Sequence, residues 1–252
     1  MAFDIDRDSV VVLYKGGRLP SWRQLSIIQQ NAASQEHVDL MLKVARDHGL
    51  QRLEGFKLVG PRRDYQWFWL IEFQPIEGAE AWIEAELAPP YGLYGYYEYF
   101  LSRRCGADFF DSWVRDRMPP TVPLDADPHQ IPELWTDRSS AILLMFERWR
   151  PGAEAIEPVA RGDAEHEARM RQVASEQRLL RLEVFQLIDR QWPWHRVYVM
   201  EFPSFEAVEV FIDAEVQPPH GLYTEVYFYL ARKWSPEYMA SWVSYAAMTV
   251  KK

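Results

Sequence analysis

Hydrophobic and polar positions along this chain repeat with two periods, one of about two residues and one of about 3.6. The first is the period of a half-buried strand and the second that of an amphipathic helix. Strand-like runs of both halves cover residues 10–15, 52–59, 65–73, 94–101, 141–148, 181–188, 194–202 and 223–230. The chain is therefore expected to fold as an α+β protein.

Helical patterns separate these runs. Ser34 is expected to cap a helix that Gly49 ends, and Asp163 to open its counterpart in the second half. A second helical pattern in each half stops at a double proline, Pro89-Pro90 or Pro218-Pro219. Each half thus predicts the order β-α-β-β-α-β. A short appended helix is expected through Phe109, Phe110 and Trp113, or through Tyr238, Met239 and Trp242.

The two halves are copies of one another. Residues 53–114 align without a gap on residues 182–243, and roughly a third of the pairs are identical. Five prolines lie between the copies, as in a stiff linker. We predict a first repeat over 1–117, a linker over 118–137 and a second repeat over 138–252.

The order β-α-β-β-α-β is that of the ferredoxin-like split βαβ unit. Its antiparallel sheet carries helices on one face, so the other face needs cover, which a second copy would supply. In element order and duplication the chain resembles the dimeric α/β-barrel superfamily, in a tandem-duplicated, single-chain form. The resemblance implies two ferredoxin-like units with facing antiparallel sheets.

Composition excludes several function classes. The net charge of −9 and the absence of a basic cluster argue against nucleic acid as a partner. The longest apolar stretches are strand-sized, which argues against a membrane span. The N-terminus is acidic where a signal peptide would be basic, and the single Cys105 forms no intrachain disulfide, so a cytoplasmic location is expected.

Candidate chemistry comes from strand alternation. In the third strands, alternation places two rows on the face expected to be free of helices: Trp67, Trp69, Ile71 and Phe73, and Arg196, Tyr198, Met200 and Phe202. In the fourth strands it places Glu98 and Glu225 on that face, and Val226, Phe228 and Leu230 toward the helices. Glu98, Glu225 and Arg196 thus lie among aromatic residues. A carboxyl group in an aromatic cleft has a raised pKa and can move protons, while an arginine can stabilise an anion. Two alternatives stay open: Glu225 pairs with Arg196 as a structural ion pair, or the assignment of faces is inverted.

Further candidates surround these groups. His220, in the loop after Pro218-Pro219, is a possible general base or a surface residue. His195 points away from Arg196 and is expected to be exposed. The residues expected to stack on a flat substrate are Trp67, Trp69, Tyr96, Tyr198 and Tyr227.

Three function hypotheses follow. The resemblance implies first a cofactor-independent enzyme of the monooxygenase, isomerase or cyclase type, acting on a hydrophobic or aromatic small molecule. The alternatives are a non-catalytic binding module and, less favoured, a haem protein with His220 or His195 as ligand. No histidine pair has helical metal-ligand spacing, so neither a metal nor a cofactor is expected. The assembly is expected to be a pseudo-symmetric monomer or a homodimer.

Overall fold

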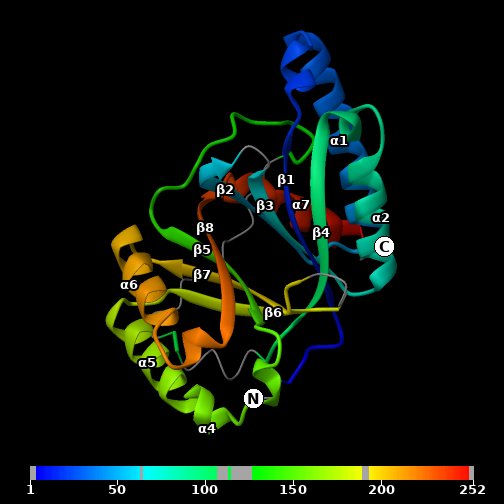
Figure 1. Ribbon diagram of the computed structural model, residues 1–252. Coiled ribbons are helices and arrows are strands. Elements are labelled where there is room, and N and C mark those ends of the chain that lie inside the picture. Colours follow the sequence, from blue (N-terminus) through cyan, green and yellow to red (C-terminus); the bar gives the residue numbers. More distant parts are fainter. Residues whose placement is uncertain (1–3, 63–64, 107–112, 115–126, 189–192, 250–252) are drawn as a thin grey trace. The chain divides into compact units, whose positions relative to one another are not determined.

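The computed structural model describes residues 4–62, 65–106, 113–114, 127–188 and 193–249, and these form two compact units (Figure 1). The first, which we call the β1–β4 unit, takes its described residues from 7–102, 127–137 and 233–249. The second, the β5–β8 unit, takes them from 4–6, 103–106, 113–114 and 138–232. The end of each sequence repeat therefore belongs to the compact unit built mainly from the other repeat. Residues 103–106 and 113–114 belong to the β5–β8 unit, and residues 233–249 belong to the β1–β4 unit.

The β1–β4 unit contains a four-stranded sheet in the order β4-β1-β3-β2, and the described pairs are antiparallel. Its elements are β1 (Val10–Arg18), η1 (Pro20–Gln24), α1 (Ile27–His48), β2 (Arg52–Arg62), β3 (Tyr65–Phe73), α2 (Ile76–Leu87), η2 (Tyr91–Tyr94), β4 (Gly95–Arg104) and α7 (Pro236–Thr249).

The β5–β8 unit contains the corresponding antiparallel order β8-β5-β7-β6. Its elements are β5 (Ala141–Trp149), η3 (Ala153–Ala155), α4 (Pro158–Arg161), α5 (Asp163–Glu176), β6 (Arg181–Leu187), β7 (Arg196–Phe202), α6 (Phe205–Glu215), η4 (His220–Leu222) and β8 (Thr224–Trp234). The predicted element order is confirmed in both units. Of the predicted appended helices, α7 is present, whereas Phe109 and Phe110 lie outside the described residues.

The first helix starts earlier than the sequence indicated. Ser26, not Ser34, is its N-cap: the Ser26 hydroxyl accepts from the Gln29 backbone N–H, and the Gln29 side chain accepts from the Ser26 backbone N–H. This reciprocal capping box stabilises the helix start at Ser26. Ser34 lies within a run of good helix formers, so the helix continues through it. The helix ends at Gly49 as predicted, in the left-handed conformation with φ +66°.

Each sheet packs one face against the helices of its own unit. In the β1–β4 unit, Ile71 and Phe73 pack with Met41 of α1 and Trp82 of α2, and Trp242 of α7 joins the same cluster. In the β5–β8 unit, Met200 and Phe202 of β7 pack with residues of α5 and α6, including Met170 and Phe211. The opposite faces are also apolar and buried, with Phe68 and Leu70 at 0% exposure.

These contacts correct the predicted face of the third strand in each repeat. Trp69, Ile71 and Phe73 lie with the helices, not on the helix-free face. The prediction was wrong because β3 is apolar on both faces, so alternation carries no sign of direction. In the fourth strands the prediction is confirmed, since Val226 and Phe228 pack toward the helices.

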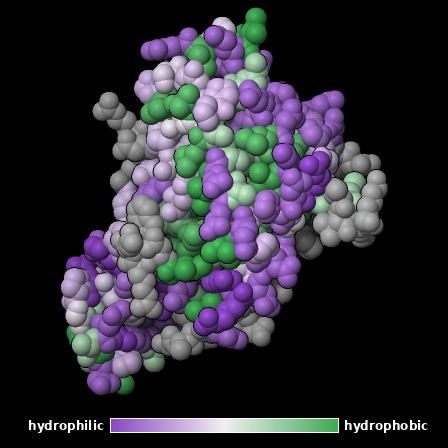
Figure 2. Space-filling model, turned by 90° about the vertical axis from the view of Figure 1, so that its right-hand side faces the viewer, coloured by the Kyte–Doolittle hydropathy of each residue, from purple (hydrophilic) through white to green (hydrophobic). Residues whose placement is uncertain are grey.

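The surface shown in Figure 2 mixes hydrophobic and hydrophilic residues. Isolated apolar side chains such as Ile27, Ile28 and Val159 are largely exposed, which is ordinary for a protein surface. Among the described helices, none combines the length and the apolar character that a bilayer crossing requires.

Candidate functional site

A cavity of about 320 Å³ lies within the β1–β4 unit, lined by the sheet and by helices α1, α2 and α7. Five tryptophans contribute to its lining: Trp67, Trp69, Trp82, Trp234 and Trp242. The Trp67 and Trp234 rings stack with their centroids 5.6 Å apart, and the edge of Trp69 meets Trp234 at 5.5 Å. Flat apolar walls of this kind suit a planar ligand.

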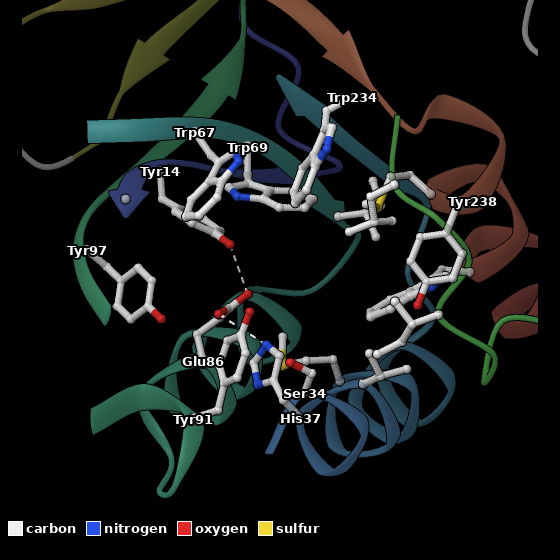
Figure 3. Close-up of a pocket in the computed structure, with 18 of the residues that line it drawn as sticks. Tyr14, Ser34, His37, Trp67, Trp69, Glu86, Tyr91, Tyr97, Trp234 and Tyr238 are labelled. Carbon is white, nitrogen blue, oxygen red and sulfur yellow. Dashed lines mark hydrogen bonds and ion pairs between the residues drawn. The ribbon is translucent and has the colours of Figure 1, made fainter. Parts of the chain in front are cut away.

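A short chain of polar groups crosses the cavity from the sheet to the helices (Figure 3). Tyr14 of β1 donates from its hydroxyl to Glu86 Oε1 of α2 at 3.0 Å. The other carboxylate oxygen, Glu86 Oε2, lies 3.4 Å from His37 Nε2 of α1. Tyr91 stacks on the His37 imidazole at 3.8 Å, with the rings 10° from parallel. These contacts thus connect a phenol, a buried carboxylate and an imidazole.

Burial keeps the Tyr14 phenol protonated. Desolvation and the neighbouring Glu86 carboxylate raise the pKa of Tyr14 well above its ordinary value near 10. Tyr14 is therefore a hydrogen-bond donor throughout the neutral range.

Arg18 supplies a positive charge to the same cavity. Its guanidinium lies over the Tyr91 ring at 3.6 Å and donates to the Tyr97 hydroxyl at 3.2 Å. Burial lowers the pKa of Arg18, although Tyr97 and Glu86 oppose this change. Burial also raises the pKa of Tyr97 to about 12, against the opposing effect of Arg18. At neutral pH the pair is a cation and a neutral phenol, so the cation can attract an anionic group of a ligand.

The corresponding positions of the β5–β8 unit carry a different set of side chains. Glu147 accepts a hydrogen bond from the Tyr198 hydroxyl, and Arg196 Nη1 lies 3.7 Å from Glu147 Oε2. Burial lowers the pKa of Arg196, but Tyr198 and Glu147 outweigh it, so the net pKa is raised. Burial and Glu147 together raise the pKa of Tyr198 well above 10. This interior is held by an ion pair and a phenol.

The carboxylates predicted to be catalytic lie outside the Trp-lined cavity. Glu98 pairs with Lys15 at 2.7 Å and accepts from the Tyr65 hydroxyl at 2.6 Å. Glu225 is partly exposed and pairs with Arg148 at 2.6 Å. The predicted ion pair between Glu225 and Arg196 is wrong, because alternation puts the two side chains on opposite faces of their sheet.

The predicted aromatic residues divide between the two units. Trp67 and Trp69 line the cavity. Tyr198 instead belongs to the Glu147 network. The Tyr227 ring is tilted by 58° against the Tyr229 ring, with the centroids 4.9 Å apart. Tyr96 lies 6.3 Å from Tyr65, on the helix-free side of its sheet.

Both histidines considered from the sequence lie in the β5–β8 unit. His195 is exposed as expected. His220 is buried, not at the surface: its ring stacks on His166 at 3.9 Å and its Nδ1 lies 3.1 Å from Asp163 Oδ1. His220 therefore lies against α5.

The sequence analysis missed a repeated pair of residues, His37 with Glu86 and His166 with Glu215. In both pairs Nε2 lies 3.4 Å from Oε2. The two histidines are 129 residues apart, as are the two glutamates, which is the spacing of the repeat itself. Glu86 and Glu215 lie within the aligned ranges 53–114 and 182–243, whereas His37 and His166 lie upstream of them.

No family model matches this chain, and neither does any curated protein. Solved structures do match. A mutant of the chlorite dismutase from Candidatus Nitrospira defluvii superposes with a TM-score of 0.67 at 9% identity, covering 95% of each chain. A second mutant gives 0.67 at 10% identity over 96% of each chain, and the same enzyme in complex with imidazole gives 0.64 at 10% over 95%. At such identity the likeness shows the fold alone.

This likeness confirms the predicted fold, an α+β chain of two ferredoxin-like units. It also corrects the first function hypothesis. Chlorite dismutases bind haem, and the expectation of a cofactor-independent enzyme is overturned by this finding. The hypothesis rested on fold analogy, and one fold can carry unrelated chemistries.

Proposed function

We propose that this protein binds haem in the cavity of its β1–β4 unit, with His37 as the iron ligand. One observation carries the proposal: an imidazole paired with a buried carboxylate lies beside a tryptophan-lined cavity, in a chain with the fold of haem-binding proteins.

The donor set fits haem iron. Histidine is a common axial ligand of haem, and the ligating imidazole generally donates its second N–H to a carboxylate or carbonyl. When one nitrogen of His37 donates to Glu86, the other keeps its lone pair for a metal.

The cavity walls fit a flat macrocycle with acidic substituents. Trp67, Trp69 and Trp234 offer flat apolar surfaces. Arg18 offers a positive charge for a carboxylate of the ligand. The hydrogen bond from Tyr14 to Glu86 connects the sheet to α2 beside these rings.

Haem bound here would supply a redox-active iron, and the chain would supply the rest of the site. His37 would hold the metal, with its orientation fixed by Glu86 and by the stacked Tyr91 ring. Tyr14 would act as a hydrogen-bond donor, because its hydroxyl stays protonated at neutral pH. The tryptophans would exclude water from the ligand.

The cavity distinguishes between the two histidine and glutamate pairs. His37 lines the 320 Å³ cavity. In the β5–β8 unit, Glu147, Arg196 and Tyr198 occupy the positions that correspond to the cavity residues Gly16, Trp67 and Trp69. The pair in the β1–β4 unit is therefore the one we assign to haem.

The test is a haemin titration of the full chain, followed by the Soret band and by quenching of tryptophan fluorescence. We expect one haem per chain with the spectrum of a histidine-ligated iron. His37→Ala should lose that spectrum, while His166→Ala, altered at the same position of the other repeat, should keep it. Metal-free protoporphyrin should quench the wild type and His37→Ala alike, because stacking needs no iron. A wild type without a Soret shift, or a His37→Ala spectrum equal to wild type, would contradict the proposal.

A further inference from the structure

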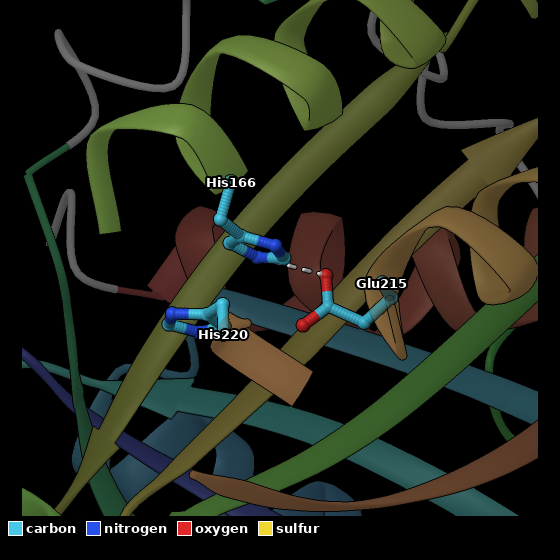
Figure 4. A group of neighbouring side chains, drawn as sticks. All are labelled: His166, Glu215 and His220. Atoms are coloured by element: carbon cyan, nitrogen blue, oxygen red, sulfur yellow. Dashed lines mark ion pairs between the residues drawn. The ribbon is translucent and has the colours of Figure 1, made fainter. Parts of the chain in front are cut away.

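A cluster of three potential metal ligands, none of them assigned to haem, lies in the β5–β8 unit (Figure 4). His166 comes from α5, Glu215 from the last residue of α6, and His220 from the first residue of η4. One ligand atom from each residue lies within 4.8 Å of the others. Because the ligands come from three elements, no spacing in the sequence indicates them.

We propose that His166, Glu215 and His220 bind a divalent transition-metal ion of the zinc class. Two imidazoles and one carboxylate form a common set of zinc ligands that leaves one position open. Nitrogen and oxygen donors of this kind favour Zn²⁺, Co²⁺ or Ni²⁺ over Mg²⁺ and Ca²⁺. The inference concerns residues outside the proposed haem site and does not depend on it.

The distances are close to those that zinc requires. Bonds of about 2.0–2.1 Å in a tetrahedron separate ligand atoms by about 3.3 Å. His166 Nε2 and Glu215 Oε2 are already 3.4 Å apart. The widest separation, at most 4.8 Å, closes with a movement of about 1–2 Å, in which the two stacked rings tilt toward the ion.

A carboxylate behind one ligand supports the assignment. Asp163 Oδ1 lies 3.1 Å from His220 Nδ1, so the proton of His220 is held on Nδ1 and the lone pair is on Nε2. An oriented carboxylate, histidine and metal in this order is the usual arrangement of metal-ligating histidines. Asp163 is itself held by Arg161 at 2.7 Å.

Arg169 disfavours metal binding by His166. Its Nη2 lies 3.2 Å from His166 Nδ1, which favours the tautomer with a proton on Nε2. Arg169 also donates to the carbonyl oxygens of Ala214 and Gln217. Metal binding moves the proton of His166 to Nδ1, and Arg169 then keeps only its carbonyl partners.

The repeat provides a natural control. In the β1–β4 unit, His37 and Glu86 make the same 3.4 Å pair, but the stacked ring is Tyr91, at 3.8 Å and also 10° from parallel. The position of Asp163 is Ser34 in that repeat. Only the β5–β8 unit thus combines a third donor with the carboxylate that orients it.

The experiment measures Zn²⁺ bound to the chelator-treated full chain by equilibrium dialysis, with Co²⁺ absorption as a probe of coordination. We expect one Zn²⁺ per wild-type chain. His220→Tyr copies the ring stack already present at Tyr91, so this variant should fold. Because it removes a ligand, its affinity for Zn²⁺ should fall by more than the ~10–100-fold that is typical of losing a residue that only orients a ligand. Asp163→Asn should lose about 10–100-fold. Tyr91→His should add a second, weaker ion.

Two controls separate ligation from damage to the fold. Circular dichroism and Tm of the metal-free variants report folding, and Arg169→Met should bind Zn²⁺ at least as tightly as the wild type. Equal Zn²⁺ affinity in the wild type and His220→Tyr would overturn the proposal. So would a wild type that binds no stoichiometric Zn²⁺. Neither result would alter the haemin titration, so the two proposals fail separately.

Discussion

The two units of this duplication use the same framework for two different interiors. In the β1–β4 unit, Gly16 and Trp67 are paired across strands β1 and β3, and in the β5–β8 unit the corresponding pair is Glu147 and Arg196. Trp69 and Trp234 likewise correspond to Tyr198 and Cys105. These four differences between the repeats replace a tryptophan-lined cavity with a buried polar network. A duplicated fold can keep its packing and still change its chemistry.

The largest effect is expected from breaking the polar network. Arg196→Met should lower the free energy of unfolding by about 3 kcal/mol, because Glu147 then stays buried without its cation. Trp67→Met, at the corresponding position, should cost only about 1–2 kcal/mol, since it removes ring contacts and leaves no charge unpaired. Urea unfolding of both variants measures the difference. Equal losses would mean that the network adds nothing beyond packing.

A second change should fill the cavity. A side chain added at Gly16 meets Tyr97 Cδ1 at 2.7 Å, so Gly16→Val should destabilise the fold by about 1–3 kcal/mol through overpacking and should weaken haem binding. Gly60 has no atom within 4 Å of an added Cβ, so Gly60→Val serves as the control. Thermal unfolding and haemin titration of both variants provide the comparison. Haem binding by Gly16→Val at wild-type affinity would place the ligand elsewhere.

The smallest expected effect is a pH dependence specific to the β5–β8 unit. Burial lowers the pKa of His220, His166 acts in the same direction, and Asp163, Glu215 and Glu147 oppose it. The unfolded chain, with a histidine pKa of about 6.5, then binds a proton that the folded chain does not. The free energy of unfolding should therefore fall as the pH drops from 7 through about 6.5, and it should fall less in His220→Tyr.

This prediction is checked by urea titrations at pH 7 and at about pH 5.5. A wild type and a His220→Tyr variant with the same pH dependence would show that His220 does not titrate differently in the folded chain.

The fold was accessible from the sequence because two signals agreed. Periodicity indicated each strand and helix, and the repeat showed that residues such as Trp113 and Trp242 have the same role in both copies. Which face of a strand contacts the helices was harder to predict. Strand β3 is buried on both faces, and no row of polar residues marks one face as the outer one.

The candidate sites were harder to predict for a physical reason. The ligand sets are assembled from residues far apart in the chain, such as His37 and Glu86, and only the folded helices bring them together. Trp67 and Trp69, predicted to stack on a substrate, line the cavity, whereas Glu98 and Glu225 form ion pairs with Lys15 and Arg148. A carboxylate on a strand says little until its partner is known.

The central claim is that the two repeats carry separate sites, and one paired experiment tests it most directly. Wild type, His37→Ala and His220→Tyr are each titrated with haemin and with Zn²⁺. We predict that His37→Ala loses the histidine-ligated haem spectrum and keeps Zn²⁺, whereas His220→Tyr loses Zn²⁺ and keeps the haem spectrum. Loss of both ligands in either variant, or of neither in both, would contradict the assignment of one site to each unit.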